Sequence, residues 1–307
     1  MPGRVVVVGS LNMDFVARVP RLPKPGETLM STAFRTVPGG KGANQAVAAA
    51  RQGCQVAMVG RVGTDTYGTI LLDGLSSAGV DVTFVQRDPD TTTGLALILV
   101  NDDGENTITV VPGANARLNT EHLLPAHEAI RTASVVLAQL EVPTDTVACA
   151  LEHARNCGAR TLLNPAPATP LLPHVLELVD FLVLNETEAE ILTRTPVGTL
   201  GDARRAAVQL REIGGMTVIV TLGSKGALLV GAHVHHVEGL EVPVVDSTAA
   251  GDSFVGTFAA AIAGGQDPLE ALRLANAAGA LAVTRLGAQP SLPNRVELEA
   301  FMQGRAP

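Results

Sequence analysis

The stretch Asp246-Ser247-Thr248-Ala249-Ala250-Gly251-Asp252-Ser253-Phe254 joins an apolar run at 242–245 to an alanine-rich helical run at 254–263. The first N–H groups of a helix have no partner inside the helix, and the helix dipole places positive potential at the same end. Gly251 and the alanines leave room for a ligand oxygen to reach those donors. The stretch therefore predicts an anion site in which Asp252 accepts a proton from a substrate hydroxyl. The alternative is that Asp252 only caps the helix.

Outward from this stretch, strand-like apolar runs alternate with helical patterns for most of the chain. Strands are predicted at 5–9, 55–60, 134–139, 160–164, 181–185 and 217–221, and helices at 42–52, 67–78, 145–157, 203–213, 254–263 and 268–284. This alternation predicts an α/β fold with a mainly parallel sheet that helices cover on both faces. In such sheets ligands bind beyond the carboxyl ends of the strands.

Two regions break this alternation. Strands are predicted at 13–19 and 27–36, and at 94–101 and 105–111, where the last two flank the hairpin signal Asp102-Asp103-Gly104. Because these pieces carry no helices, they predict a small β appendage, which serves as a lid over the site or as an edge for dimer formation. With no repeats and no low-complexity linker, residues 1–307 are expected to form a single domain with this elaboration.

Composition excludes several functions. Of the 307 residues 46% are apolar, yet no stretch is long and uninterrupted enough to span a bilayer. The formal net charge of -8 leaves no global basic footprint for nucleic acid and no polybasic patch for a membrane. Three cysteines do not make a disulfide framework, and the apolar run at 5–8 reads as a strand, not a signal peptide. A cytoplasmic protein is expected.

A second glycine-rich turn precedes a helix at Pro38-Gly39-Gly40-Lys41-Gly42-Ala43-Asn44-Gln45-Ala46. The glycines let the backbone approach a polar ligand, Lys41 supplies a cation, and Asn44 supplies a donor and an acceptor. The spacing is neither that of a Walker loop nor that of the dinucleotide fingerprint. Taken alone, this turn is weak evidence for a binding site.

Polar side chains follow several of the predicted strands. Asn12 and Asp14 point to the same side of a strand, which suits a pair of vicinal hydroxyls, although an Asx turn explains them equally well. Glu141 is a carboxylate at the same sheet edge or a solvated loop acid. Glu188 is placed to hold Mg²⁺ through water, or residues 185–188 only cap a helix. The turn at 221–226 contacts a nucleotide or is a simple hairpin.

At this point the chain resembles the ribokinase-like (PfkB) carbohydrate kinases. The resemblance rests on 39–46, on 246–252 and on the tail Thr284-Arg285-Leu286-Gly287-Ala288-Gln289-Pro290-Ser291, and it covers nearly the whole chain. It implies a three-layer α/β/α sandwich with a small β-sheet lid that also forms a homodimer interface. The implied reaction is ATP-dependent phosphorylation of D-ribose at its 5-hydroxyl. The alternatives are a sister kinase for deoxyribose, a nucleoside or another furanose, and a sugar-binding protein without catalysis.

The resemblance also implies roles for individual residues. Asp252 is the expected base, and the amides of Ala249, Ala250 and Gly251 form the expected anion hole. The residues expected to hold the sugar are Asn12, Asp14, Gly40, Lys41, Asn44, Glu141 and Asp252. Those expected to contact ATP are Asn185, Thr221, Gly223, Ser224, Gly226, Gly251 and Asn276, with Glu188 helping to place Mg²⁺. A monovalent cation, K⁺, is expected beside Asp246 and Ser291 and the carbonyls of Thr248, Ala282, Arg285 and Gly287.

Overall fold

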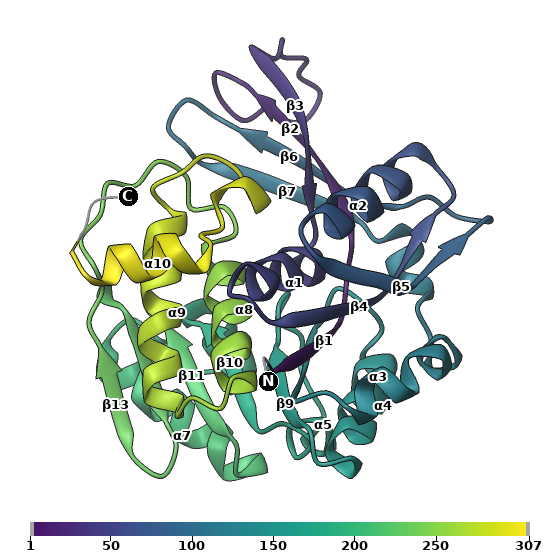
Figure 1. Cartoon of the computed structure of the whole chain (residues 1–307). Coiled ribbons are helices and arrows are strands. Elements are labelled where there is room, and N and C mark those ends of the chain that lie inside the picture. Colours follow the sequence, from purple (N-terminus) through teal and green to yellow (C-terminus); the bar gives the residue numbers. More distant parts are fainter. Residues whose placement is uncertain (1–2, 305–307) are drawn as a thin grey trace.

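The computed structural model describes residues 3–304 and contains a nine-stranded sheet with helices on both faces (Figure 1). The strands follow the order β13-β12-β11-β10-β9-β8-β1-β4-β5, and only β12 and β13 run antiparallel to their neighbours. The bounds are β1 Arg4–Val8, β4 Gln55–Gly63, β5 Val80–Asp88, β8 Val135–Gln139, β9 Arg160–Asn164, β10 Phe181–Asn185, β11 Thr217–Thr221, β12 Ala227–Val230 and β13 Val234–Val237.

The helices form two layers. One layer contains α1 Lys41–Arg51, α2 Thr66–Ser77, α8 Ala250–Ala263, α9 Pro268–Ala282 and α10 Arg295–Met302. The other contains α3 His127–Arg131, α4 Thr144–Asn156, α5 Pro173–Leu176, α6 Glu186–Thr193 and α7 Leu200–Gly214. Short 3-10 helices are found at Gly113–Arg117, Thr120–Ala126, Gly223–Lys225 and Gln289–Ser291.

The central strands are apolar on both faces because both faces are covered. In β1, Val6 and Val8 belong to the core that contains α4 and α7, whereas Val5 and Val7 belong to the core that contains α1 and α8. All four valines are fully buried. The continuous apolar run at 5–8 is therefore the pattern of a central parallel strand, and the predicted α/β architecture is confirmed.

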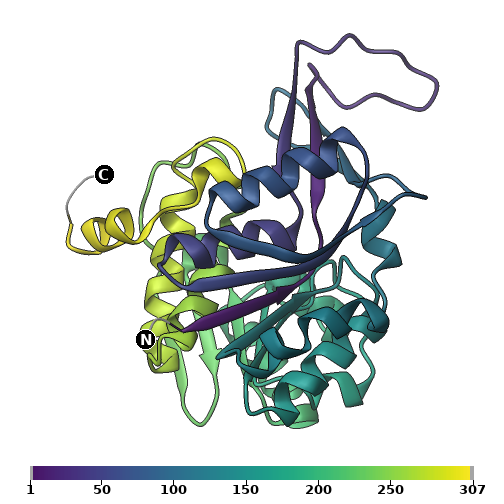
Figure 2. The same ribbon diagram turned by 45° about the vertical axis from the view of Figure 1, so that its right-hand side comes forward.

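A separate four-stranded sheet in the order β3-β2-β6-β7 rises from the body of the molecule (Figures 1 and 2). Its strands are β2 Asn12–Arg18, β3 Ala33–Gly39, β6 Gly94–Val100 and β7 Asn106–Val111. Strand β3 begins at Ala33, whereas a strand is predicted at 27–36. Residues 20–32 instead form the long excursion between β2 and β3 (Figure 2). Only residues 9–11 separate β1 from β2, so the chain passes directly from the large sheet into the small one.

Two larger elements lie outside the predicted set. Strand β5 forms one edge of the large sheet and is buried only in part, so it lacks the continuous apolar run of the central strands. Helix α10 is short and packs against α9 through Leu298, its single buried residue. Within residues 3–304, no helix combines the length and the apolar character that crossing a bilayer requires.

Candidate active site

The site forms where the strand order of the large sheet changes direction, between β1 and β8. From β1 the chain proceeds to β4 and β5 on one side, and it later returns to β8 on the other. Such a switch point opens a crevice beyond the carboxyl ends of the two neighbouring strands. Ser10 follows β1 and Glu141 follows β8, and the Ser10 hydroxyl donates a hydrogen bond to the Glu141 carboxylate. The backbone N–H of Lys41 donates to the same carboxylate at 3.0 Å, which fixes the start of α1 over the crevice.

Gly40 makes this entry into α1 possible. Gly40 is the N-cap residue of α1 and has a φ of 88°, a backbone conformation that residues with a side chain rarely adopt. A Cβ at this position would lie 2.7 Å from the backbone nitrogen of Asn12. A glycine is therefore required for α1 to start directly against β2.

The first cavity of the site has a volume of about 530 Å³ and lies between the switch point and the small sheet. All the residues expected to hold the sugar line it: Asn12, Asp14, Gly40, Lys41, Asn44, Glu141 and Asp252. Asn12 and Asp14 face it together, as the alternation along β2 predicts. The Oδ1 atom of Asn44 is buried and accepts no hydrogen bond from the described residues, so it is an acceptor available to a ligand hydroxyl.

Asp252 is 8% exposed and lies in the first turn of α8. Its Oδ2 accepts a hydrogen bond from Asn44 Nδ2 and its Oδ1 accepts one from Gln45 Nε2, both at 2.9 Å. The N-cap position belongs to Ala249, which has a left-handed backbone with a φ of 60° and forms no side-chain cap. Asp252 therefore does not act as a helix cap, and its carboxylate is held from α1.

Charged groups around this cavity shift one another's pKa. Burial raises the pKa of Asp252, and the Lys41 ammonium and the amides of Asn44 and Gln45 oppose that rise. Burial and the nearby carboxylates of Glu141 and Asp252 raise the pKa of Asp14 to about 7. Burial works against the charge of Lys41, but its acidic neighbours, Asp252 first, raise its pKa overall. Lys41 is therefore a stable cation among four carboxyl groups, those of Asp14, Glu141, Glu188 and Asp252.

A second cavity of about 500 Å³ lies on the other side of Asp252. Asn185, Glu188, Thr221, Gly223 and Gly251 line it. Four residues line both cavities: Lys41, Ser247, Ala249 and Asp252. The carboxylate and the ammonium thus stand at the junction between the cavity that the small sheet borders and the cavity at the N-terminus of α8.

The backbone at this junction offers hydrogen-bond donors. The amides of Ala249, Gly251 and Asp252 have no partner among the described residues, and the amide of Ala250 makes a long bond of 3.3 Å to the carbonyl of Ser247. A Cβ at Gly251 would meet nothing within 4 Å, so the space beside the start of α8 is open there. Free N–H groups at the start of a helix are the donors that anion sites use.

Three of the residues expected to contact the nucleotide do not line the second cavity. Gly226 packs against the backbone of Val237 and Glu238, and Asn276 in α9 donates a hydrogen bond of 2.9 Å to the Glu238 carbonyl. These two contacts hold the segment after β13 in place. Ser224 lies in the 3-10 helix Gly223–Lys225, one residue beyond the part of the turn that reaches the cavity.

Four further residues support the site, although no sequence pattern points to a role for them. Gln45 Nε2 also donates to Asn164 Oδ1 at 3.0 Å, and Gln139 Nε2 donates to Gln45 Oε1 at 2.6 Å. Asn115 donates to Asn12 Oδ1 at 2.7 Å and orients that side chain. For two of these residues the sequence offers a signal, which is their place in the chain. Gln45 follows Asn44 in the segment 38–46, and Gln139 is the last residue of β8.

Comparison with known families matches residues 3–295 to the pfkB family carbohydrate kinases. The chain belongs to this family. It is 41% identical over 301 residues to the ribokinase of Bacillus subtilis (strain 168), covering 97% of this chain and 99% of that protein. It is 39% identical over 300 residues to the deoxyribokinase of Salmonella typhi, covering 97% and 98%. The structure of Arabidopsis thaliana ribokinase complexed with ribose and ATP matches with a TM-score of 0.92 at 34% identity over 99% of both chains.

This pfkB kinase has a donor set that fits Mg²⁺ carried by a nucleotide. Glu188 uses Oε2 to accept the backbone N–H of Asn185 at 2.8 Å, and its other oxygen makes no hydrogen bond among residues 3–304. Burial raises the pKa of this carboxyl. Mg²⁺ in kinases is typically held by one or two carboxylates, by water and by the phosphates themselves. Within the described residues no group of three or more His, Cys, Asp or Glu is arranged to hold a metal by itself.

The loops expected to hold K⁺ are tied together by Asp246. Its Oδ1 accepts the Thr248 N–H at 2.9 Å and its Oδ2 accepts the Gly287 N–H at 2.9 Å. Burial works against the charge, but these bonds lower the pKa of Asp246 overall. Asp246, Thr248 and Gly287 line the first cavity, whereas Ala282, Arg285 and Ser291 do not line it. Carboxylate, hydroxyl and carbonyl oxygens are the donors that a hard cation prefers.

Proposed function

We propose that this kinase transfers the γ-phosphoryl group of ATP to the 5-hydroxyl of D-ribose and makes ribose 5-phosphate. The observation that carries the proposal is the position of Asp252 and Lys41, which line both the sugar-side cavity and the cavity at the start of α8. A hydroxyl that enters from one side and a phosphate that enters from the other meet at these two residues. The ribokinases among the relatives support ribose as the acceptor.

The sugar-side cavity fits a small polyol. Asn12, Asp14, Lys41, Asn44 and Glu141 offer donors and acceptors in close proximity, and the free Oδ1 of Asn44 supplies one unpaired acceptor. A phosphorylated sugar would instead require a pair of arginines, which bind phosphate in a bidentate way. Arg18 and Arg35 also line this cavity, from β2 and β3 of the small sheet, and Arg35 lies 4.0 Å from the Asp246 carboxylate, so the two do not form a free pair for a sugar phosphate.

The reaction requires positioning and charge neutralisation more than covalent chemistry from the protein. The 5-oxygen of the sugar attacks the γ-phosphorus, the bond from that phosphorus to the bridging oxygen breaks, and ADP leaves. Asp252 accepts the hydroxyl proton as the new bond forms. The amides of Ala249, Ala250 and Gly251, together with Lys41, stabilise the negative charge on the transferring group.

On the nucleotide side, Asn185, the 221–226 turn and Gly251 hold ATP, with Asn276 acting through the segment it supports. Glu188 would hold Mg²⁺ through water, and the ion would supply positive charge that neutralises the phosphates. Asp246, Ser291 and the carbonyls of Thr248, Ala282, Arg285 and Gly287 would hold K⁺, whose charge would strengthen the field at the anion site. Asp246 also accepts the backbone N–H of Gly287, which fixes the loop that leads to the amides of Ala249, Ala250 and Gly251.

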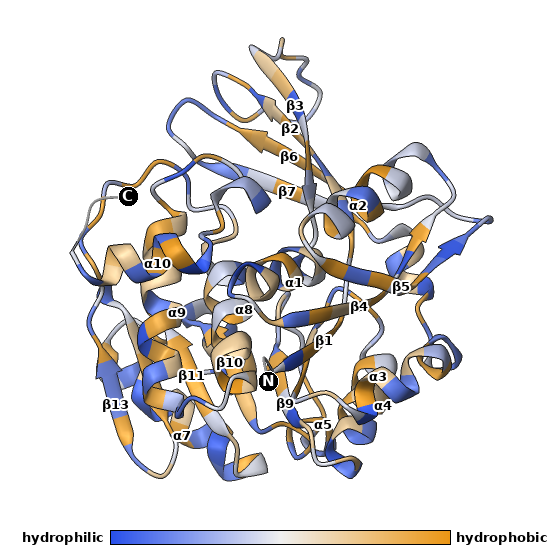
Figure 3. Ribbon diagram, in the orientation of Figure 1, coloured by the Kyte–Doolittle hydropathy of each residue, from blue (hydrophilic) through white to orange (hydrophobic). Residues whose placement is uncertain are grey.

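The four-stranded sheet acts as a lid on a single domain and as the contact surface of a homodimer. Ile108 and Val110 of β7 line the sugar-side cavity, and Ile108 is 54% exposed. The strands of this sheet carry several apolar residues (Figure 3). A second copy of the sheet would cover these apolar side chains. Light scattering tests this: a dimer is expected, and Ile108→Asp should shift it to the monomer. Cys54, Cys149 and Cys157 are all free, which suits a cytoplasmic location.

A second candidate substrate is deoxyribose, because the deoxyribokinase relative is as similar in identity and coverage as several ribokinases. An assay with ATP and a panel of ribose, deoxyribose, nucleosides and other furanoses, each with and without K⁺, separates the candidates. Ribose should have the highest kcat/KM and should depend on K⁺. A higher kcat/KM for deoxyribose would reassign the substrate. If calorimetry shows that ribose binds but the assay shows no turnover, the protein is a sugar-binding protein without catalysis.

A further inference from the structure

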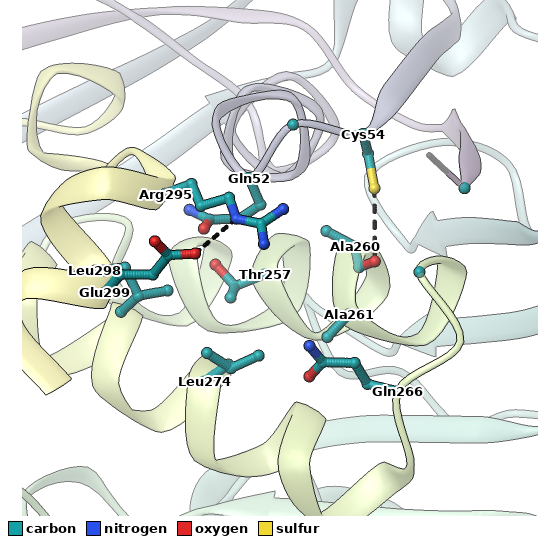
Figure 4. Close-up of a pocket in the computed structure, with 13 residues that line it drawn as sticks. Gln52, Cys54, Thr257, Ala260, Ala261, Gln266, Leu274, Arg295, Leu298 and Glu299 are labelled. Atoms are coloured by element: carbon teal, nitrogen blue, oxygen red, sulfur yellow. Dashed lines mark hydrogen bonds and ion pairs between the residues drawn. The ribbon is translucent and has the colours of Figure 1, made fainter. Parts of the chain in front are cut away.

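A cavity of about 240 Å³ lies away from the active site, between the end of α1 and helices α8, α9 and α10 (Figure 4). None of its lining residues lines either cavity of the active site. Its polar lining comes from Gln52, Cys54, Thr257, Gln266, Arg295 and Glu299. Figure 4 shows Thr257, Gln266 and Arg295 projecting into the same space from three different segments.

Thr257 is the feature that points to a ligand. It is 2% exposed, and its hydroxyl has no hydrogen-bond partner among the described residues. A threonine inside a helix usually donates to the carbonyl four residues earlier, as Thr193 does in α6 with a bond of 2.7 Å to the Ala189 carbonyl. A buried hydroxyl without a partner destabilises the fold. A group that enters the cavity and pairs with this hydroxyl would remove that cost.

The other polar groups indicate which chemistry fits. Gln52 donates to the Pro293 carbonyl at 2.9 Å, and its own amide oxygen remains free of partners among residues 3–304. The Gln266 amide makes no side-chain hydrogen bond within the same residues. The charges of Arg295 and Glu299 neutralise each other through an ion pair of 2.8 Å. The lining is thus neutral overall and offers hydroxyl and amide groups as both donors and acceptors, which suits an uncharged hydroxylated molecule.

From these observations we propose that the cavity is a second binding site, for a small uncharged polyol. Its volume of about 240 Å³ equals that of about eight water molecules at about 30 Å³ each, which leaves room for a small polyol. The cavity also touches the two helices that carry the active site. Helix α1 presents Lys41 at its other end, and α8 presents Asp252, so the site lies behind the catalytic groups on shared elements.

Calorimetric titration of the full chain with ribitol tests the proposal. Asp14→Ala damages the sugar-side cavity, and Ala261→Met fills the second cavity from α8. Ribitol binding should persist in Asp14→Ala, disappear in Ala261→Met, and weaken roughly three- to tenfold in Thr257→Val, because one hydrogen bond is lost. Thr257→Val keeps the side-chain volume, so it decides the matter if Ala261→Met does not fold.

Two results would overturn the second site. One is the absence of ribitol binding at millimolar concentration in the wild-type chain and in Asp14→Ala. The other is binding that disappears in Asp14→Ala and stays unchanged in both Ala261→Met and Thr257→Val, which would place all the ribitol in the sugar-side cavity. The unfolding temperature of ligand-free Thr257→Val provides an independent readout, and it should exceed that of the wild type because the unpaired hydroxyl is gone.

Discussion

Replacing Gln45 with methionine tests how the base is held. Gln45 is fully buried and donates from Nε2 to both Asp252 Oδ1 and Asn164 Oδ1. A hydrogen bond to a charged group contributes about 1.5–3 kcal/mol, and one pKa unit corresponds to about 1.36 kcal/mol. Burial already raises the pKa of Asp252, and Gln45 opposes that rise. Gln45→Met should therefore move the acidic limb of the kcat profile upward by about one to two pH units.

The assay is kcat against pH at saturating sugar and ATP, so that the profile reports the ternary complex. Gln139→Met is the matched control, because Gln139 donates to Gln45 and makes no hydrogen bond to Asp252. Both variants leave buried groups unpaired, so both should lose stability, by roughly 1–3 kcal/mol for each unpaired group. An acidic limb that stays in place in Gln45→Met, or that moves equally in Gln139→Met, would refute the assigned role.

Further predictions concern Asp14 and two glycines. The pKa of Asp14 is raised to about 7, so its carboxylate is lost below neutral pH, and the Kd for ribose measured by calorimetry should rise as pH falls from 8 to 6. The pKa of Asp14 is higher in the folded protein than in the unfolded chain, so the Asp14 carboxyl lowers the free energy of unfolding as the pH rises from about 4 to about 7. Asp14→Asn should therefore raise the unfolding temperature more at pH 8 than at pH 5. A smaller gain at pH 8 would contradict this. Gly40→Ala should cost at least about 1–3 kcal/mol in denaturant unfolding because its φ is 88° and Asn12 lies in the way, whereas Gly251→Ala should leave stability nearly unchanged. Equal stability losses would count against the geometry.

The central layers of the fold could be predicted from the sequence because burial on both faces leaves a simple pattern. The valines of β1 are apolar without interruption, and each following helix has its own apolar face. Strand β5 and the start of β3 lack that signal, since both lie at sheet edges: three of the nine β5 residues are buried, and the first four residues of β3 are exposed. Their positions depend on pairing with distant neighbours.

The candidate site could be predicted in part. Strand ends and glycine-rich turns indicated Asn12, Lys41 and Asp252, because a parallel sheet brings its carboxyl ends together. Whether Asp252 caps the helix or faces a ligand could not be decided locally, since the answer depends on Asn44 and Gln45, more than 200 residues away in the chain.

The most direct test of the central claim is the turnover of Asp252→Asn with ATP and ribose. The substitution keeps the size of the side chain, and the free Oδ1 of Asn44 can accept a hydrogen bond from the new amide, so the fold should persist. Loss of a general base typically lowers the rate by about 10²–10⁴-fold. We predict a fall in kcat within that range, with ribose still bound in a calorimetric titration. Turnover close to that of the wild type in a folded Asp252→Asn protein would contradict the account.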